Sequence, residues 1–268
     1  MDSLITKEVT KVKNKSTKDL LVIIPAYNEE KNITALLDKL SEPRIADIAD
    51  ILVMNDASSD ATNWIVKNRK YRLVTHVFNM GYGSALQLGY KYAIRRGYKY
   101  VIQMDADGQH DVCNIPVIYE KLQEKDENGR CADVVLGSRF MEGSAPYPVA
   151  FLKRIAWCMF RNIIKLFTGK RIADPTTGLQ GLSRRMVLFY SKYNHFDDRY
   201  PDANIIMRIL MLGFRVTEIP AVMHVRTEGV SMHSGLKPIV YMIRMLFSIA
   251  ATWVGVKIFK IDQGAADE

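Results

Sequence analysis

Apolar runs of strand length alternate along the first half of the chain with stretches in which apolar residues recur at helical spacing. The runs predict strands at residues 20–24, 51–54, 71–77, 98–104 and 132–136. The intervening spacing predicts helices at residues 29–40, 61–68 and 85–96. Nearly continuous apolar strands separated by helices are typical of a parallel sheet that is covered on both faces. The pattern therefore predicts an α/β protein with a mostly parallel, Rossmann-like sheet.

The rhythm changes beyond residue 140. There the spacing predicts helices at 149–167, 203–212 and 236–259, a strand at 214–219 and a polar loop at 174–180. We see no repeat and no low-complexity linker, so we expect the C-terminal third to pack on the sheet and to contact an acceptor. The chain then divides into a basic arm (residues 1–18), a sheet domain (19–230) and a C-terminal helix with its tail (231–268).

The composition is that of an ordinary globular protein, with 48% hydrophobic and 25% charged residues among 268. The net charge of +8 suits an anionic partner such as a nucleotide, a nucleic acid or an anionic lipid, although it also serves solubility. Three scattered cysteines are too few for a disulfide framework or a zinc knuckle, and they fit a reducing compartment.

No segment reads as a signal peptide or a membrane span. Residues 1–18 are polar and carry five lysines, without an apolar core. The most apolar stretch, 238–256, has nineteen residues and is interrupted by Arg244. Because a span needs about 20 mostly apolar residues and a central arginine is costly there, we expect a helix that lies on the protein or in the membrane interface.

Two carboxylates follow the strand predicted at 98–104. Asp105 and Asp107 are two residues apart, so in an extended segment their side chains point the same way. Such a pair suits Mg²⁺ or Mn²⁺, which proteins hold with one or two carboxylates and substrate phosphate oxygens. Gln109 continues the alternation and can reach the metal or the acceptor. The alternative is a turn rich in aspartate and glycine without a ligand.

Polar residues also follow the first two strands, at the edge where ligands gather in such sheets. We expect Asn28 to cap the following helix, which leaves Pro25, Ala26 and Tyr27 as a ledge for a nucleobase or ribose. Asp56, after the second strand, can accept a hydrogen bond from a base N–H or can cap a helix.

The glycine pattern argues against a nicotinamide or flavin dehydrogenase. The first of these turns lacks glycine altogether. Gly81 and Gly83 follow the third strand, but Leu86 stands where a dinucleotide-binding turn needs its third glycine.

Taken together, these motifs resemble family 2 glycosyltransferases of the GT-A fold, and most closely the dolichyl- and polyprenyl-phosphate sugar synthases. The strings that carry the resemblance are IPAYNEE (24–30), NDASSD (55–60), NMGYGSA (79–85), DADGQH (105–110) and GSRF (137–140). DPTTGLQ (174–180) resembles a later loop of that branch, and Glu218 to Pro220 with Arg226, Gly229 and Ser231 resembles its last motif.

The resemblance implies a GT-A catalytic domain over residues 19–230 and assigns roles to individual residues. A UDP- or GDP-linked sugar would bind along Pro25, Ala26, Tyr27, Glu29, Asp56, Gly81, Asp105 and Ala106. Mg²⁺ or Mn²⁺ would be surrounded by Asp105, Asp107 and Gln109. Phosphate on the acceptor side would meet Arg139, Thr177, Arg226 and Ser231. The residues expected to take part in catalysis are Asp107, Gln109, Asp202 and Arg226.

The chain departs from the family pattern at two places. Gln180 stands where the family loop ends in arginine, which puts one phosphate contact in doubt. The family often has glutamate in the helix near Asn204, whereas this chain has Asp202 two residues earlier.

The helix predicted at 149–167 is basic and rich in aromatic residues, and lysines and arginines accompany it to residue 171. This pattern fits a helix in the membrane interface, with a core helix as the alternative. Nucleic acid binding is not expected, because no recognition module is present. We therefore expect a cytoplasmic enzyme that is peripheral at the inner face of the membrane, where a small membrane protein can anchor it.

The leading interpretation is an inverting transfer of one sugar to polyprenyl phosphate, dolichyl or undecaprenyl. One alternative is a transferase that extends a capsule, an exopolysaccharide or another lipid-linked glycan through a sugar hydroxyl, with Asp202 as its base. A third is a nucleotide-sugar binding protein without activity, against which the intact Asp105 and Asp107 argue.

Overall fold

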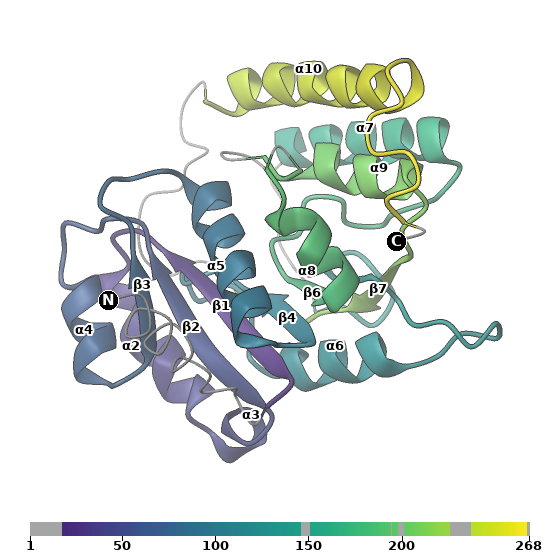
Figure 1. The fold of residues 1–268 in the computed structure, drawn as a ribbon. Coiled ribbons are helices and arrows are strands. Elements are labelled where there is room, and N and C mark those ends of the chain that lie inside the picture. The colour runs from purple at the N-terminus through teal and green to yellow at the C-terminus, as the bar shows by residue number, and fades with distance from the viewer. Residues whose placement is uncertain (1–17, 146–150, 194, 198–200, 226–236, 267–268) are drawn as a thin grey trace, which may run out of the picture.

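A computed structural model describes residues 18–145, 151–193, 195–197, 201–225 and 237–266. Within them, one mixed sheet forms the centre of the molecule (Figure 1). Its strands are β1 (Leu20–Ala26), β2 (Ala49–Asn55), β3 (Arg72–Thr75), β4 (Tyr100–Gln103), β5 (Val134–Ser138), β6 (Gln180–Ser183) and β7 (Val216–Pro220). The basic arm, apart from Lys18, lies outside the described residues.

The strand order is β3-β2-β1-β4-β6-β5-β7. All neighbouring strands are parallel except β6, which runs antiparallel to both β4 and β5. The prediction of a mostly parallel sheet is therefore confirmed, and β6 is an addition to it. This strand begins at Gln180, where the sequence indicated the end of a polar loop.

Helices cover both faces of the sheet, because alternate residues of the central strands point to opposite sides. One core joins Leu20, Val22 and Ile24 of β1 to the helices of the first face. These helices are α2 (Glu30–Leu40), α3 (Pro43–Ala46), α4 (Thr62–Asn68) and α6 (Asn114–Gln123). The other core joins Leu21 and Ile23 to α5 (Tyr82–Arg96), α8 (Arg184–Ser191) and α9 (Ala203–Met211).

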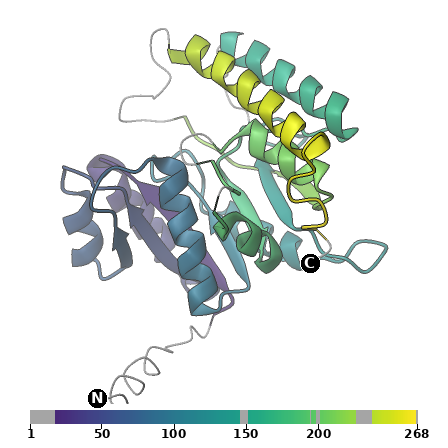
Figure 2. The ribbon, with the colours of Figure 1, turned by 45° about the horizontal axis from the view of Figure 1, so that its top comes forward.

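Two long helices form a further layer over α9. They are α7 (Phe151–Thr168) and α10 (Lys237–Lys257), and Figures 1 and 2 show them side by side. Phe167 of α7 meets Trp253 of α10, with ring centroids 5.8 Å apart. Their buried residues join the core on the α5 side of the sheet, so this layer is continuous with the sheet domain.

Two expectations about the chain as a whole can be compared with the structure. All three cysteines are free, as the sequence indicated. Within the described residues, none of the helices combines the length and the hydropathy that a bilayer crossing requires.

Candidate active site

The loops after β1 and β2 lie against each other and are joined by hydrogen bonds. The Asn28 amide N–H donates to Ser58 Oγ at 3.0 Å, and Asn28 Oδ1 accepts the Ser59 amide N–H at 2.9 Å. Asn28 itself has φ 55°, outside the helix. The expectation that Asn28 caps the next helix is therefore wrong, because α2 begins after Glu29 and its N-cap side chain makes no capping bond.

The next residues of both loops extend the same contact. The Glu30 amide N–H donates to Asp60 Oδ2 at 3.0 Å, and the Glu30 carboxylate accepts the Ala61 amide N–H at 3.0 Å. The Glu29 amide N–H donates to Thr62 Oγ1 at 2.9 Å. These bonds fix the edge of the predicted nucleotide ledge, where Ala26 is buried and the Tyr27 ring is 49% exposed.

Asp56 is buried directly after β2 and organises the loop before α5. Its Oδ2 accepts the Gly81 amide N–H and its Oδ1 accepts the Met80 amide N–H, both at 2.8 Å. The ring Nδ1 of His76 also lies 2.7 Å from Oδ1. Asp56 thus holds the turn that contains Gly81, while its predicted contact with a nucleobase stays a prediction.

Asp105 lies just beyond β4, with its carboxylate partly exposed. The Tyr82 hydroxyl donates to Asp105 Oδ1 at 2.9 Å. Burial, together with the charges of Asp105 and Asp202, raises the pKa of Tyr82 well above its usual value, so the phenol remains a donor at neutral pH. The Asp105 amide N–H donates to His110 Nδ1 at 3.0 Å, and His110 Nε2 lies 3.8 Å from Asp105 Oδ2.

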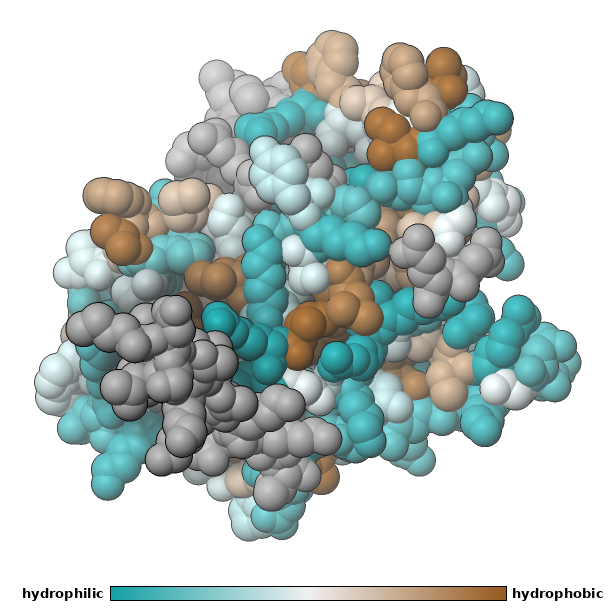
Figure 3. All heavy atoms as spheres, viewed as in Figure 1, coloured by the Kyte–Doolittle hydropathy of each residue, from teal (hydrophilic) through white to brown (hydrophobic). Residues whose placement is uncertain are grey.

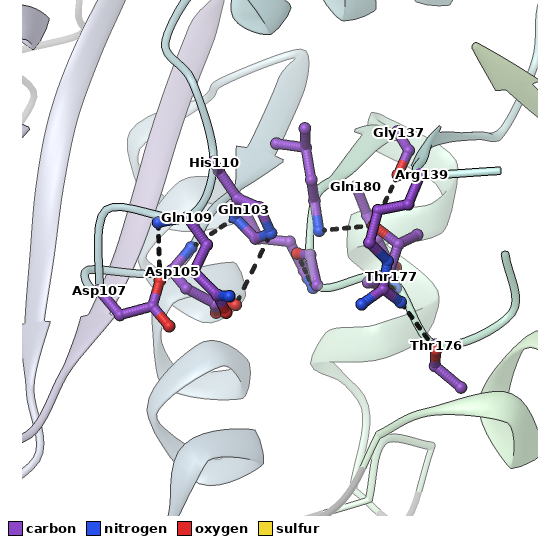
Figure 4. A network of polar contacts seen from close by, with 12 residues as sticks. Gln103, Asp105, Asp107, Gln109, His110, Gly137, Arg139, Thr176, Thr177 and Gln180 are labelled. Atoms are coloured by element: carbon purple, nitrogen blue, oxygen red, sulfur yellow. Dashed lines mark hydrogen bonds and ion pairs between the residues drawn. The ribbon is translucent and has the colours of Figure 1, made fainter. Parts of the chain in front are cut away.

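The ends of the Asp105, Asp107 and Gln109 side chains point toward one region (Figure 4). Asp107 Oδ1 accepts the Gln109 amide N–H at 3.0 Å, which shapes this turn. In the described part of the chain, Asp105 Oδ2 accepts no hydrogen bond, and no three histidine, cysteine or acidic residues form a closed metal site. A pair of carboxylates in this arrangement fits Mg²⁺ or Mn²⁺ whose remaining ligands come from a diphosphate.

The loop 174–180 borders Asp105 on its other side. A Cβ atom on Gly178 would stand 2.7 Å from Asp105 Oδ2, so any other residue at this position would shift the carboxylate from where it lies. The loop is held by Gln103, whose amide donates to the Gly178 carbonyl at 3.2 Å, and by Gln180, whose amide donates to the Thr177 carbonyl at 3.0 Å. Gln180, which replaces the family's arginine, is buried and serves the loop itself.

Thr177 is buried within the same loop. Its hydroxyl donates to the Gly137 carbonyl at 2.6 Å and accepts the Leu179 amide N–H at 3.3 Å. A phosphate contact by this hydroxyl, as the resemblance implies, would require the bond to the Gly137 carbonyl to break, because the hydroxyl has one proton to donate.

Arg139 follows β5 and is held by the start of this loop. Its Nε and Nη2 each donate to the fully buried Asp174 carboxylate at 2.7 Å, and Nη2 also donates to Thr176 Oγ1 at 2.9 Å. Asp174 is positioned in turn by Glu218 of β7, whose carboxylate accepts the amide N–H groups of Ala173 and Asp174. Burial raises the pKa of Glu218, against the effect of these two bonds. The guanidinium of Arg139 is therefore fixed in direction.

The segment after β7 runs beside the loop that carries Asp105, Asp107 and Gln109. The His224 amide N–H donates to the Gln109 carbonyl at 2.7 Å, and His224 Nε2 lies 2.8 Å from Asp111 Oδ2. Although burial acts against it, hydrogen bonds from His224 and Cys113 lower the pKa of Asp111 to about 2. Arg226 and Ser231, two of the predicted phosphate contacts, lie outside the described residues.

Asp202 and Asn204, the two positions compared with the family's acceptor-side carboxylate, have different surroundings. Asp202 precedes the helix, close enough for its charge to raise the pKa of Tyr82, after the larger effect of burial. Asn204 is buried and donates to Ser248 Oγ of α10 at 2.8 Å, so it serves helix packing.

Some contacts at this site had no signal in the sequence. Tyr82 lies inside one of the quoted motifs, but nothing there indicates that its hydroxyl reaches Asp105, 23 positions away. The Arg139–Asp174 and Asp111–His224 pairs are also separated by long stretches of chain.

Matches to known proteins identify the family. The family model described as Glycosyl transferase family 2 matches residues 21–190. The chain belongs to glycosyl transferase family 2. It is a glycosyltransferase, and the resemblance drawn from the motifs is confirmed.

Two named relatives match most of the chain. The undecaprenyl-phosphate mannosyltransferase of Micrococcus luteus is 28% identical over 256 residues, which cover 89% of this chain and 97% of that protein. The polyprenol monophosphomannose synthase of Mycolicibacterium smegmatis is 27% identical over 229 residues, or 82% of each chain. This family 2 glycosyltransferase is thus similar to polyprenyl-phosphate sugar transferases.

Among solved structures, the fold matches glucosyl-3-phosphoglycerate synthase from Mycobacterium tuberculosis in complex with Mn²⁺, UDP-glucose and phosphoglyceric acid. The TM-score is 0.62 at 18% identity, and the match covers 90% of this chain and 80% of that chain. At this identity the likeness shows the fold, which is the predicted GT-A type.

Proposed function

We propose that this glycosyltransferase moves one sugar from a UDP- or GDP-linked donor to polyprenyl phosphate at the inner face of a membrane. The observation that carries the proposal is the match to an undecaprenyl-phosphate mannosyltransferase over 97% of that protein's length. The solved relative with Mn²⁺ and UDP-glucose supports a divalent metal and a nucleotide-sugar donor.

On the donor side, the ledge formed by Pro25, Ala26 and Tyr27 would take the nucleoside, with Asp56 behind it. Asp105 and Asp107 would hold Mg²⁺ or Mn²⁺, with Gln109 beside them. A bound divalent ion supplies positive charge for the diphosphate that leaves the sugar. The protein itself contributes the Asp105 carboxylate, which accepts a hydrogen bond from Tyr82 and is bordered by Gly178, while His110 accepts the Asp105 backbone N–H.

On the acceptor side, a lipid phosphate is already ionised at neutral pH and needs little help from a base. The protein would mainly hold this phosphate in line with the anomeric carbon, so that one displacement inverts the configuration there. Arg139 supports such a role because its guanidinium is kept in one orientation by Asp174 and Thr176. Arg226 and Ser231 are further candidates for phosphate contacts, from the resemblance alone.

A second candidate is transfer to a sugar hydroxyl, as in the extension of a capsule, an exopolysaccharide or a lipid-linked glycan. This reaction needs a general base. Asp202 is the candidate: it lies directly before α9, and its charge makes the smallest contribution to the raised pKa of Tyr82, after burial and Asp105.

The exposed apolar side chains of the outer helices support work at a membrane. On α7 these are Ile155, Leu166 and Phe167, and on α10 they include Ile243 and Phe247, which is 73% exposed. Figure 3 shows brown, apolar surface over this end of the molecule.

Exposed basic residues accompany it on and after α7, among them Arg154, Lys165, Lys170 and Arg171. Part of the predicted interface helix is core, since Phe160 and Ile164 are buried.

Vesicle flotation tests the membrane part of the proposal. Binding to anionic vesicles should weaken as salt rises, because the Debye length falls from about 10 Å at 0.1 M to about 3 Å at 1 M. Absence of vesicle binding at low salt would refute the membrane part of the proposal.

The experiment that tests the whole proposal is a panel of UDP- and GDP-sugars, assayed with Mn²⁺ for release of nucleoside diphosphate. One donor should give release that depends on polyprenyl phosphate. Release that depends instead on a lipid-linked sugar would favour the second candidate.

A further inference from the structure

Tyr82 makes a direct contact with the predicted metal site. It is the first residue of α5, and its hydroxyl donates to Asp105 Oδ1 at 2.9 Å. Its ring is partly buried and packs against the core on the α5 side of the sheet. The ring position is therefore fixed by packing, and the hydroxyl is held against the carboxylate.

The helix that carries Tyr82 is itself closely seated on the sheet. A Cβ atom on Gly89 would stand 2.8 Å from Ile23 Cγ2. At this position α5 therefore lies closer to β1 than a larger residue would allow without a shift. At the start of the helix, the Gly81 amide N–H is bound by Asp56. Tyr82 thus extends from an element that is anchored at both the sheet and the preceding loop.

Two other residues, Gly178 and His110, lie near the Asp105 carboxylate without donating a hydrogen bond to it. Gly178 limits the space next to Oδ2, and His110 Nε2 stands 3.8 Å from the same oxygen, beyond hydrogen-bond distance. Among the contacts described for Asp105, the Tyr82 hydroxyl is the hydrogen-bond donor to its carboxylate. One carboxylate oxygen is therefore held, and the other is left to face the site.

We propose that Tyr82 is a positioning residue for the donor metal: it holds Oδ1 of Asp105 so that Oδ2 is presented to a divalent ion bound to the donor diphosphate. This role rests on the proposed function, because it presupposes a metal and a nucleotide at Asp105 and Asp107. Groups that orient metal-binding side chains through hydrogen bonds typically change metal affinity 10–100-fold when they are removed.

The test compares the wild-type protein with Tyr82→Phe and Tyr98→Phe. The second variant is a matched control, because the buried Tyr98 also donates its phenol to a carboxylate, that of Asp50, at the opposite ends of the strands. Free Mn²⁺ is followed by electron paramagnetic resonance while the ion is added to protein with UDP and, separately, with GDP. Nucleotide binding without metal is measured in parallel.

Tyr82→Phe should weaken Mn²⁺ binding about 10-fold and leave metal-free nucleotide binding unchanged. Tyr98→Phe should resemble wild type in both measurements. Wild-type Mn²⁺ affinity in Tyr82→Phe would overturn the positioning role alone. Equal losses in metal-dependent and metal-free binding would also overturn it, since they indicate a general packing defect. If the wild-type protein binds no Mn²⁺ with either nucleotide, the proposed metal-dependent donor site is refuted, and the role of Tyr82 with it.

Discussion

Gly178 stands so close to Asp105 that a Cβ atom at position 178 would lie 2.7 Å from the carboxylate oxygen Oδ2. The loop 174–180 therefore forms one wall of the predicted metal site. The same loop begins at Asp174, which holds Arg139, so it lies between the donor carboxylate and the predicted acceptor arginine. Changes within this loop should act on both sides of the reaction.

We expect Gly178→Ala to displace the Asp105 carboxylate and to lower kcat/KM for the donor at least about 10-fold, because a displacement near 1 Å at reacting groups is this costly. Donor kinetics and the melting temperature are the measurements. Gly255→Ala is the control, since a Cβ there meets its nearest neighbour at an ordinary 3.5 Å. Unchanged donor kinetics in Gly178→Ala would show that Asp105 is not needed in its observed position.

Asp107→Ala should lower turnover at least about 100-fold, because removal of a group that stabilises charge in the transition state has effects of this size. The fold should be nearly unchanged, since Asp107 is partly exposed at the edge of the sheet. Turnover with added Mn²⁺, with EDTA and after metal replacement is the measurement, and the exposed Asp47→Ala is the control. Near-normal turnover of Asp107→Ala in EDTA would contradict the metal assignment.

Asp202→Asn and Arg226→Ala separate the two acceptor classes. With a lipid phosphate as acceptor, Asp202→Asn should cost only a few-fold in rate, while Arg226→Ala should cost far more because a charge-assisted phosphate contact is lost. With a sugar hydroxyl, removing the base should cost roughly 10²–10⁴ in rate. Turnover of both variants is measured against polyprenyl phosphate and against a lipid-linked sugar. A large loss of rate in Asp202→Asn, with no product on polyprenyl phosphate, would favour the second candidate, transfer to a sugar hydroxyl.

The Asp111–His224 pair should make stability depend on pH in the acid range. The pKa of Asp111 is lowered from 3.8 to about 2, so its contribution is complete above pH ~4 and is lost as the pH falls toward ~2. Because His224 is 48% exposed, solvent screening keeps this contribution to about 1 kcal/mol or less. The free energy of unfolding, measured with denaturant, should differ between Asp111→Asn and wild type at pH 7, and the two values should converge near pH 2. A difference that stays constant over this range would exclude the ionised Asp111 carboxylate as its cause.

The sequence predicted the parallel part of the fold because its strands are buried on both faces. β1 and β2 are continuous apolar runs, and both appear with bounds within a few residues of those expected. β6 was missed because its four residues include Gly181 and continue a polar loop, and its place depends on pairing with β4 and β5. The helices α3, α6 and α8, of four, ten and eight residues, were also missed.

The sequence indicated which side chains lie together after β4, but not the contacts between distant segments. Asp105, Asp107 and Gln109 point toward one region (Figure 4), although residues 106–108 form a turn and not the extended segment that the prediction assumed. The contacts of Tyr82 and Gly178 with Asp105 depend on how α5 and the loop 174–180 pack against β4, which local spacing does not determine. The cap assigned to Asn28 failed because its side chain bonds to a loop 31 positions away.

The most direct test of the central claim is the mass of the lipid product formed from polyprenyl phosphate, Mn²⁺ and the preferred nucleotide sugar. We predict a lipid phosphate that carries one sugar on its phosphate oxygen, with inverted anomeric configuration, and no such product from Asp107→Ala. Polyprenyl phosphate recovered without a sugar, while a lipid-linked glycan gains one under the same conditions, would contradict the claim.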